Sequence, residues 1–456
     1  MEPLSALRII VNVEEGMAAT VNINQWIDES RFTRFHLLIF FLCLCIITFD
    51  GYDLVIYGAA VPLLLKEFAL NPAQAGVIGS YALFGAAIGA VVFGSLADRI
   101  GRKRAIIICA ALFSAATGVT GFASNAALFG VCRFLAGLGI GGAMPNVVAL
   151  ASEYAPLRNR ALMVATIFSG MQIGGIMAAS MSMWLFPVFG WRSIFWVGAL
   201  PLLLVPALIK FLPESPVQLL ARNRIRQLRS VLQKARPDLS LPGDAEFVIS
   251  KGTGKADVTA LFQEHRGFSS IMIWIVYFMN MYMIFGLGTW LPKLMMDAGF
   301  ALGSGLWFLL TLNLGAFFGS QVAGLTADRI GSKITLVFLY LLACVSITML
   351  SFTRDFYLLT VLVAFAGTGF FGGQNVAHGY VSLFYPPGMR STAMGFAFGV
   401  GRLGAIFGPA LAGFLLAMKV SLLVNFVGLA VPGLIAGLAI MLVRDKYGYS
   451  SSRRMM

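Results

Sequence analysis

The chain has 456 residues, of which 59% are hydrophobic and 12% are charged, and its mean hydropathy is +0.84. Soluble domains carry about 25% charged residues, so this composition excludes a soluble globular protein and indicates a polytopic membrane protein. The net charge of +13 follows from where Lys and Arg lie along the chain, and it does not require a nucleic-acid partner.

Apolar stretches long enough to cross a bilayer as a helix recur twelve times. A polar stretch near 213–267 divides them into six and six, so we predict an all-α protein with two six-helix bundles, 37–212 and 268–443. The segment 1–36 is mostly polar, which argues against a cleavable signal peptide, and Met17 is an alternative start. The tail is 444–456. The twelve spans are expected near 37–65, 73–96, 104–123, 126–151, 161–186, 191–212, 269–292, 303–326, 333–352, 356–384, 391–416 and 420–443.

Lys and Arg residues are distributed unequally between the two sides of these spans. If the N-terminus is cytoplasmic, the inner segments hold 26 of them and the outer segments hold five, while Arg133 and Arg402 lie within spans. Cytoplasmic segments are enriched in Lys and Arg, so we expect both termini and the central loop in the cytoplasm of a bacterial cell. The basic run from 222 to 236 is expected to lie against anionic lipid headgroups.

Two acids, Asp50 and Asp53, lie in the middle of the first apolar stretch. A charge at this depth costs roughly 3 kcal/mol on insertion scales, and residues at i and i+3 share a face of a helix. Such a pair is typical of an ion or proton pathway. Their protonation is expected to be a property of the pair.

The two halves of the chain repeat one another. The run from Gly85 to Lys103 matches the run from Gly315 to Lys333 at eleven of nineteen positions, at a constant offset of 230. Both copies end the second predicted helix of their half. Repeats with the same orientation are what the two halves of a rocking-bundle transporter require. Gly85 with Gly89, and Gly315 with Gly319, are expected to allow close helix packing.

The sequence predicts no metal site, no cofactor and no enzymatic centre. The five cysteines all lie within apolar stretches, where they are expected to be small core residues. The glycines 137, 139 and 142 fit a dinucleotide-binding pattern but lie inside a predicted membrane helix. The run from Gly252 to Lys255 lacks the first Gly and the Ser/Thr of a phosphate loop. An ATP-driven pump and a membrane enzyme are therefore disfavoured.

Three motifs carry a family resemblance that covers the chain from about Val21. The run from Gly94 to Lys103, GSLADRIGRK, resembles the signature of the loop between helices 2 and 3 of the major facilitator superfamily, and 213–216 (PESP) is also typical of it. The run Asp50-Gly-Tyr-Asp53 looks like the first-helix motif of the aromatic acid:proton symporters. The longer runs DGYDLVIYGAAVP and GSYALFGA are similar to the benzoate-transporter branch.

Arg133 and Arg402 are the intramembrane cations. Arg133 either snorkels or caps backbone as a structural residue, or it pairs with the first-helix acids or the substrate carboxylate; in the superfamily this Arg is linked to proton coupling. Arg402 lies near the middle of the eleventh helix among glycines, and no buried acid of the second half is an obvious partner. A guanidinium can hold a carboxylate through two hydrogen bonds, so substrate binding is favoured over pairing with backbone, and the resemblance implies the same.

Further polar residues are candidates for lining the same cavity, with ordinary packing as the alternative for each. These are Gln374, Asn375 and His378 in the tenth helix, Gln172 in the fifth, and Asn280 and Tyr282 in the seventh. Aromatic stacking on a substrate ring is possible for Phe370, Phe371, Phe396, Phe398 and Phe407, although lipid or core packing is the default for a Phe.

A separate group of charges lies at the predicted cytoplasmic ends of helices. In the superfamily such groups form a network that locks the inner side, and ordinary interfacial charges are the alternative. The expected gating residues are Asp98, Arg99, Arg102 and Glu153, with Asp328 and Arg329 in the second copy.

The resemblance and the residues together predict a monomeric, proton-coupled importer of an aromatic carboxylate in the bacterial inner membrane. The expected partners are this acid, such as benzoate or a hydroxybenzoate, together with protons and membrane lipids. The alternatives are a symporter for another organic acid, such as muconate, or for a sugar, a drug:proton antiporter, and a transporter-like chemoreceptor. The C-terminus lacks the P-E-T sequence of sugar symporters, and the fifth helix lacks the proline of drug antiporters.

Overall fold

The computed structural model describes residues 11–12, 20–242, 245–249 and 258–449. Met17 and the run from Gly252 to Lys255 lie outside these ranges. Within them, twelve helices are long and apolar enough to cross a membrane, which confirms the predicted number. They are α3 (Arg34–Glu67), α4 (Pro72–Ile100), α5 (Arg102–Thr120), α6 (Ala126–Tyr154), α7 (Leu157–Phe189), the broken sixth span (Arg192–Phe211), α12 (Gly267–Asp297), α13 (Leu302–Ile330), α14 (Ser332–Met349), α15 (Phe356–Phe384), α16 (Arg390–Ala417) and α17 (Leu422–Leu442).

Local sequence explains where these helices begin, turn and break. Asn71 caps α4 with a capping box to Gln74. Gly101 and Gly331, at the offset of 230, join the second and third helices of each half at φ of 108° and 95°, where a residue with a Cβ is strained. Two prolines divide the sixth span into α8 (Arg192–Val197), η1 (Leu200–Leu204) and α9 (Val205–Phe211).

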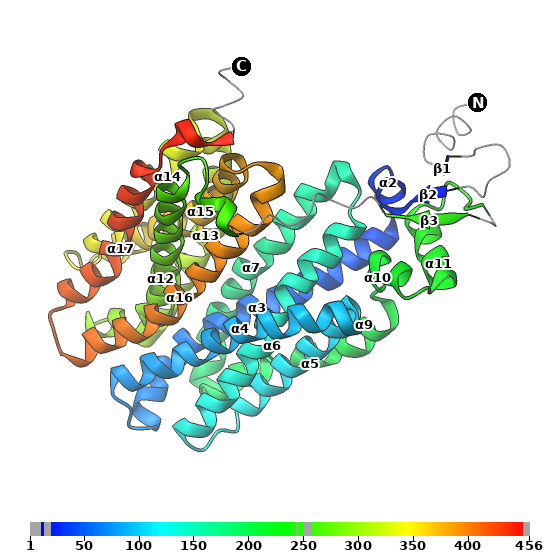
Figure 1. Cartoon of the computed structure of the whole chain (residues 1–456). Helices are drawn as coiled ribbons and strands as arrows, with labels where there is room; N and C mark the ends of the chain where they lie inside the picture. Colours follow the sequence, from blue (N-terminus) through cyan, green and yellow to red (C-terminus); the bar gives the residue numbers. More distant parts are fainter. Residues whose placement is uncertain (1–10, 13–19, 243–244, 250–257, 450–456) are drawn as a thin grey trace.

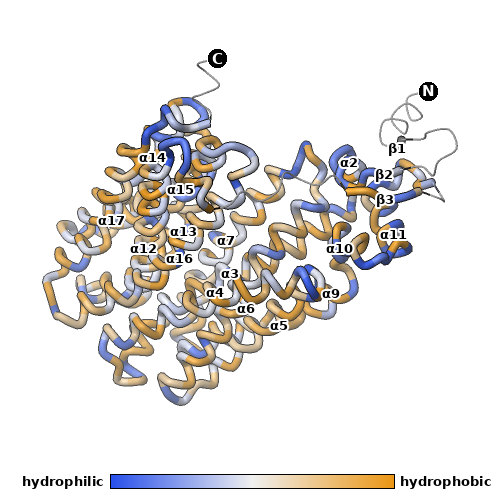
Figure 2. The backbone as a smooth tube through the Cα atoms, in the orientation of Figure 1, coloured by the Kyte–Doolittle hydropathy of each residue, from blue (hydrophilic) through white to orange (hydrophobic). Residues whose placement is uncertain are grey.

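The helices form two bundles, α3–α9 and α12–α17, which lie side by side (Figure 1). Glycines allow close packing inside each bundle. A Cβ on Gly89 would overlap the backbone of Leu138, and one on Gly315 would overlap the backbone of Ala364. The expectation that these glycines allow close helix packing is therefore confirmed, and the structure shows that the partner helices are α6 and α15. The apolar residues cover the helices, whereas hydrophilic residues gather toward the helix ends (Figure 2).

The described chain begins and ends at the same end of the bundles, which we call the terminal end (Figure 1). The two bundles contact one another closely toward the opposite end, through α4 with α16 and α3 with α12. Ser80 Oγ donates a hydrogen bond of 2.6 Å to the carbonyl oxygen of Ile406. A Cβ on Gly76 would overlap the backbone of Pro409, and one on Gly58 would overlap that of Gly288. We call this contact the seal.

A small folded unit covers the terminal end of the first bundle, and the sequence did not predict it. We call it the cap. It consists of β1 (Val11–Asn12), β2 (Thr20–Asn22), α2 (Ile23–Asp28), α10 (Pro216–Ala221), α11 (Ile225–Ala235) and β3 (Glu246–Val248). Strand β2 pairs in parallel with β3, with Val21 opposite Phe247. Trp26 is fully buried in the cap's apolar core, and its Nε1 donates to the carbonyl oxygen of Leu232 at 3.2 Å.

The basic run 222–236 forms α11 and the turn before it, and its apolar side faces the core of the cap. Leu228 and Leu232 are buried against Trp26, and the Arg236 guanidinium lies 5.4 Å from the centroid of the Trp26 ring. Arg224 and Arg226 remain exposed. The expected contact of this run with lipid headgroups stays a prediction for the exposed side only. Three short 3₁₀ segments complete the fold: η2 (Val258–Phe262), η3 (Pro387–Met389) and η4 (Asp445–Tyr447).

Candidate functional site

A cavity of about 800 Å³ lies between the two bundles, within the usual size range of small-molecule sites. Eight helices line it, four from each bundle: α3, α4, α6 and α7, and α12, α13, α15 and α16. The lining extends to Ala161 and Ser382, which lie within one turn of helix ends at the terminal end. The seal closes the other end. The cavity therefore extends from the middle of the bundles toward the terminal end.

Asp53 is held in a buried ion pair away from the cavity. Arg133 Nη1 donates to Asp53 Oδ1 at 2.9 Å and to Oδ2 at 2.8 Å, and Nη2 donates to the Asp53 carbonyl oxygen at 3.2 Å. The Thr117 hydroxyl donates to Oδ1 at 2.5 Å. Both charged side chains are 1% exposed. Among the alternatives for Arg133, the structure shows the pair with a first-helix acid, Asp53.

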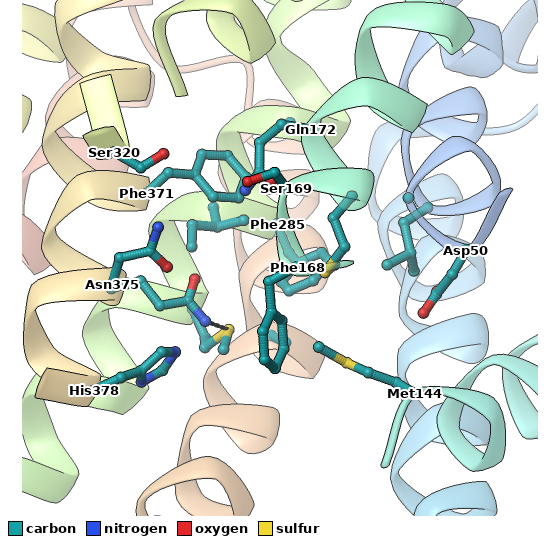
Figure 3. A pocket seen from close by; sticks show the side chains of 18 of the residues that line it. Asp50, Met144, Phe168, Ser169, Gln172, Phe285, Ser320, Phe371, Asn375 and His378 are labelled. Atoms are coloured by element: carbon teal, nitrogen blue, oxygen red, sulfur yellow. Dashed lines mark hydrogen bonds between the residues drawn. The ribbon is translucent and has the colours of Figure 1, made fainter. Parts of the chain in front are cut away.

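Asp50 faces the cavity instead (Figure 3). It is 1% exposed, and its Oδ1 has no hydrogen-bond partner within the described chain. The expectation that the two acids lie together at one site is therefore wrong. Asp53 lies against α5 and α6, whereas Asp50 lies at the cavity wall, because positions three apart on a helix differ by about 60° in direction.

Arg402 lines the cavity from α16, in the second bundle. No hydrogen bond or ion pair to its side chain is present among the described residues, and the residue is partly buried. Asp50, from the first bundle, lines the same cavity. A guanidinium and a carboxylate without close partners thus face the same cavity from opposite bundles.

Three predicted residues of α15 line the cavity together with Arg402: Gln374, Asn375 and His378. His378 Nδ1 lies 2.7 Å from the Tyr277 hydroxyl, and the His378 ring lies 4.7 Å from that of Phe398. Among the described residues, the Gln374 side chain forms one hydrogen bond, to the Met281 sulfur at 3.9 Å. Gln172 lines the cavity from α7 of the first bundle. Of the six polar residues named as candidates besides Arg402, the structure thus brings four to one cavity.

Tyr282 is the exception and requires a correction. It does not line the cavity, and neither does Asn280; both are buried in α12, with the Tyr282 carbonyl close to Gly408 of α16. Helix α12 is apolar on all sides, so its sequence gives no clear indication of which side faces the cavity.

Only some of the phenylalanines predicted to stack on a substrate ring line the cavity. Phe371 and Phe398 line the cavity, Phe370 is buried in the second bundle, and Phe396 and Phe407 are 39% and 47% exposed on the outer surface of the bundles. Sequence reasoning missed several lining residues: Phe168, Ser169, Phe285, Met144 and Asn313. Phe168 and Ser169 could have been found, because they precede Gln172 by four and three positions and so share its helix face.

The predicted gating residues lie outside the cavity, at the terminal end. Arg102 Nη2 forms an ion pair of 2.9 Å with Glu153 Oε1. Asp98 and Arg99 have exposed side chains, and their carbonyl oxygens accept hydrogen bonds from α10, from Gln218 and Arg222. The first-copy loop is thus held to the first bundle's own cap.

Glu214 also holds the first-copy loop, and the corresponding charges of the second bundle form fewer contacts. Glu214 Oε1 accepts from the Lys103 backbone N–H at 3.0 Å. In the second copy, Lys333 Nζ lies 3.2 Å from Asp445 Oδ2, while Asp328 and Arg329 are exposed and form no ion pair within the described chain. No contact between these charges of the two bundles is present in the described structure.

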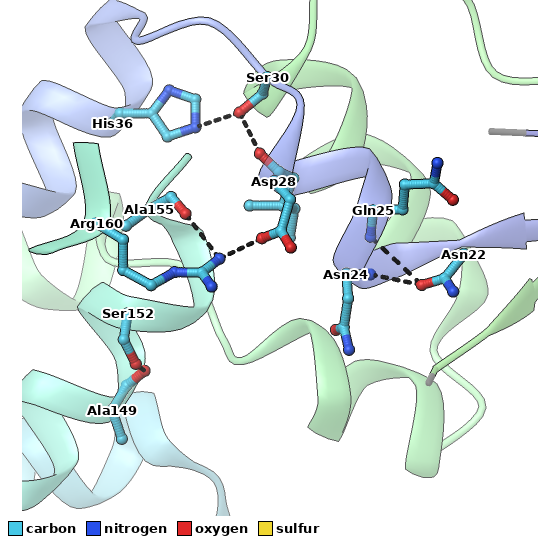
Figure 4. A network of polar contacts seen from close by, with 11 residues as sticks. Asn22, Asn24, Gln25, Asp28, Ser30, His36, Ala149, Ser152, Ala155 and Arg160 are labelled. Atoms are coloured by element: carbon cyan, nitrogen blue, oxygen red, sulfur yellow. Dashed lines mark hydrogen bonds and ion pairs between the residues drawn. The ribbon is translucent and has the colours of Figure 1, made fainter. Parts of the chain in front are cut away.

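The cap also contacts the start of α7. Asp28, at the end of α2, forms an ion pair with Arg160, which donates a second hydrogen bond of 3.0 Å to the Ala155 carbonyl oxygen (Figure 4). Ser30 Oγ contacts the His36 ring at 3.4 Å at the start of α3. The cap, together with the residues that follow α2, therefore contacts three segments of the first bundle. These are the loop after α4, the start of α7 and the start of α3.

The sequence profile of the Major Facilitator Superfamily matches residues 41–319 and 273–454, which together cover most of the chain. The chain belongs to this superfamily. The predicted fold class and family are thereby confirmed, as is the prediction that the protein is a transporter and not an enzyme.

Curated relatives narrow the family further. The chain is 42% identical over 441 residues to the benzoate transport protein of Acinetobacter baylyi, covering 95% of each chain. It is 34% identical over 428 residues to the gallate transporter of Pseudomonas putida, covering 93% of this chain and 95% of the relative. It is 31% identical over 422 residues to the 4-hydroxybenzoate transporter PcaK of Acinetobacter baylyi, covering 91% and 92%.

Solved structures show the same fold. The crystal structure of a D-xylose-proton symporter superimposes with a TM-score of 0.70 at 19% identity, covering 91% of this chain and 98% of the other. The xylose transporter XylE from E. coli, in a partially occluded inward-open conformation, gives a TM-score of 0.69 at 18% identity, covering 89% and 98%.

Proposed function

We propose that this protein is a proton-coupled symporter that imports an aromatic carboxylate, benzoate or a close relative, by alternating access. The observation that carries the proposal is the unpaired Arg402 facing Asp50 across a cavity between the two bundles. A cation in the middle of a membrane-spanning helix is costly without a partner, so an anionic ligand is its natural complement. The names of the curated relatives support an aromatic acid as that ligand.

The orientation of the chain completes the proposal. The unequal distribution of Lys and Arg favours a cytoplasmic terminal end, in a bacterial inner membrane. The seal then lies on the outer side, and the cavity extends toward the cytoplasm, as in an inward-facing transporter. For the opposite state, the seal must part and the terminal ends of the bundles must approach one another.

The two acids have different parts in this mechanism. Ionised Asp50 competes with the substrate carboxylate for the positive charge of Arg402. When Asp50 takes a proton from the outer side, this competition ends, and the acid binds Arg402 through two hydrogen bonds. The Asp53–Arg133 pair, sealed from the cavity, holds α3 to α6. Release of the proton on the inner side restores the negative charge of Asp50 and weakens the hold on the substrate, so proton and acid move together.

The test uses purified protein in liposomes with an imposed pH gradient, acidic outside, and radiolabelled benzoate or hydroxybenzoate. Because neutral aromatic acids cross bilayers unaided, protein-free liposomes and the Arg402→Ala variant serve as controls. We expect accumulation above both controls that collapses with an uncoupler, and exchange without accumulation in Asp50→Asn. Accumulation that is indifferent to the uncoupler, or retained in Asp50→Asn, would overturn the coupling assigned to Asp50. Binding without net flux would favour a chemoreceptor.

A further inference from the structure

We infer that the cavity contains a second recognition site, built by the amides of Gln172 and Asn375, for a hydroxyl group on the aromatic ring of the substrate. This inference rests on the proposed function, because it takes the cavity to bind an aromatic acid. It goes further by assigning the preferred ligand to hydroxylated benzoates and by naming the residues that select it.

The positions of the side chains separate this site from the charged one. Gln172 and Ser169 from α7, Ser320 from α13, and Phe371 and Asn375 from α15 gather in one part of the cavity (Figure 3). Asp50 lies apart from this group, beyond Phe168 in the same view. The polar group is therefore distinct from the carboxylate-bearing wall.

The hydrogen bonds of the group leave two amides free for a ligand. Ser169 Oγ donates to the Ala165 carbonyl oxygen at 3.1 Å, and Ser320 Oγ donates to that of Ala316, so both hydroxyls are engaged in their own helices. Neither the Gln172 nor the Asn375 side chain has a hydrogen-bond partner in the described chain, although Gln172 is only 9% exposed. Each amide offers two donors and one acceptor oxygen.

When the cavity closes around a substrate, these free amides favour a substrate that carries a hydroxyl group. Water can satisfy them while the cavity is open to the terminal end. When the bundles close around a substrate, this water is displaced, and an amide without a new partner weakens binding. Unsubstituted benzoate has no group to replace the water, because its carboxylate is engaged by Arg402. A ring hydroxyl both donates and accepts, so it can pair with an amide.

The neighbouring side chains suit an aromatic ring in this position. Phe371 precedes Asn375 by four residues on α15 and so lies on the same helix face, and Phe285 and Phe168 border the group (Figure 3). Ring faces pack well on such side chains. Because Gln172 belongs to the first bundle and Asn375 to the second, the site is complete only when both bundles contribute.

The experiment measures the affinity of purified protein for benzoate, 3-hydroxybenzoate and 4-hydroxybenzoate by calorimetric titration. The variants are Gln172→Met and Asn375→Leu, which keep the side-chain volume and remove the amide. Ser382→Ala is the matched control, because Ser382 lines the same cavity two turns from Asn375 on α15. Thermal midpoints of the ligand-free variants check that each one folds.

We expect the wild type to bind one of the hydroxybenzoates at least tenfold more tightly than benzoate. The Asn375→Leu or Gln172→Met variant should lose about tenfold for that acid, which is ~1.4 kcal/mol. It should bind benzoate at least as tightly as the wild type does, because no amide is then left without a partner. The Ser382→Ala control should retain the preference. Equal or tighter binding of benzoate by the wild type, or equal losses for all three acids in the variants, would overturn the second site while leaving the proposed function intact. Failure of all three acids to bind would overturn both.

Discussion

The two first-helix acids offer a matched test of how the structure distributes buried charge. Asp53→Asn removes the negative partner of Arg133, which is 1% exposed and whose Nη1 donates to both carboxylate oxygens. Breaking a buried ion pair by removing one partner costs about 3–5 kcal/mol, because the other charge is left uncompensated. Asp50→Asn, three residues away, removes a carboxylate that forms no ion pair among the described residues and whose Oδ1 has no hydrogen-bond partner there, so it should not destabilise the fold.

The assay is thermal unfolding of purified protein in detergent, without ligand. With an unfolding entropy of about 2 cal/mol/K per residue, 3–5 kcal/mol in a chain of 456 residues lowers the midpoint by roughly 3–5 °C. We expect this shift in Asp53→Asn, and an unchanged or higher midpoint in Asp50→Asn. The double variant Asp53→Asn/Arg133→Met should recover most of the loss, because it removes both buried charges.

Two outcomes would refute this reasoning. Equal destabilisation by Asp50→Asn and Asp53→Asn would mean that the acids act as one coupled pair, as the sequence alone suggested. A double variant as unstable as Asp53→Asn would mean that the loss comes from the Thr117 hydrogen bond or from packing, and not from the unpaired Arg133.

The remaining predictions concern transport. Arg402→Lys should keep the fold but lose at least tenfold in affinity for the acid, because a single ammonium does not reproduce a two-point contact; unchanged affinity in a titration would contradict the assignment. Glu153→Gln, which breaks the 2.9 Å pair with Arg102, should change the uptake rate by about three- to tenfold while affinity stays constant; a parallel change in affinity would argue for direct binding. Gly76→Trp should prevent closure of the seal, so that a cysteine in place of Thr289 becomes reactive to an impermeant maleimide from outside; unaltered labelling would contradict this. Uptake at fixed internal pH should fall as the external pH rises, because fewer Asp50 side chains carry a proton; a flat profile would exclude coupling.

Features that depend on chain composition were predictable from the sequence. The spans followed from apolar length, and the ends of the second helix in each half followed from the internal repeat. The structure places Gly101 and Gly331 at these ends, with a positive φ at which a residue with a Cβ is strained. Arg402 was identified as a cavity residue because an unpaired charge in the middle of a membrane helix requires a ligand or partner.

Features that depend on the neighbours of a helix were not predictable. The sequence placed Asp50 and Asp53 on a common face, but packing on α5 and α6 decided that only Asp53 meets Arg133. Tyr282 was assigned to the cavity although α12 is apolar all round. The cap was missed because its central strand pairing joins Val21 to Phe247, which are far apart in the sequence.

That strand pairing has a consequence for the order of biosynthesis. Strand β2 near the N-terminus cannot complete its sheet until β3, at residues 246–248, has left the ribosome. By then all six spans of the first bundle have been synthesised, whereas α12, which begins at Gly267, has not yet left the ribosome. The sheet of the cap can therefore close when all helices of the first bundle are present and before the second bundle has emerged. The second bundle then inserts beside a neighbour whose helix ends are already fixed, so damage to the cap should appear first as a defect in assembly and yield.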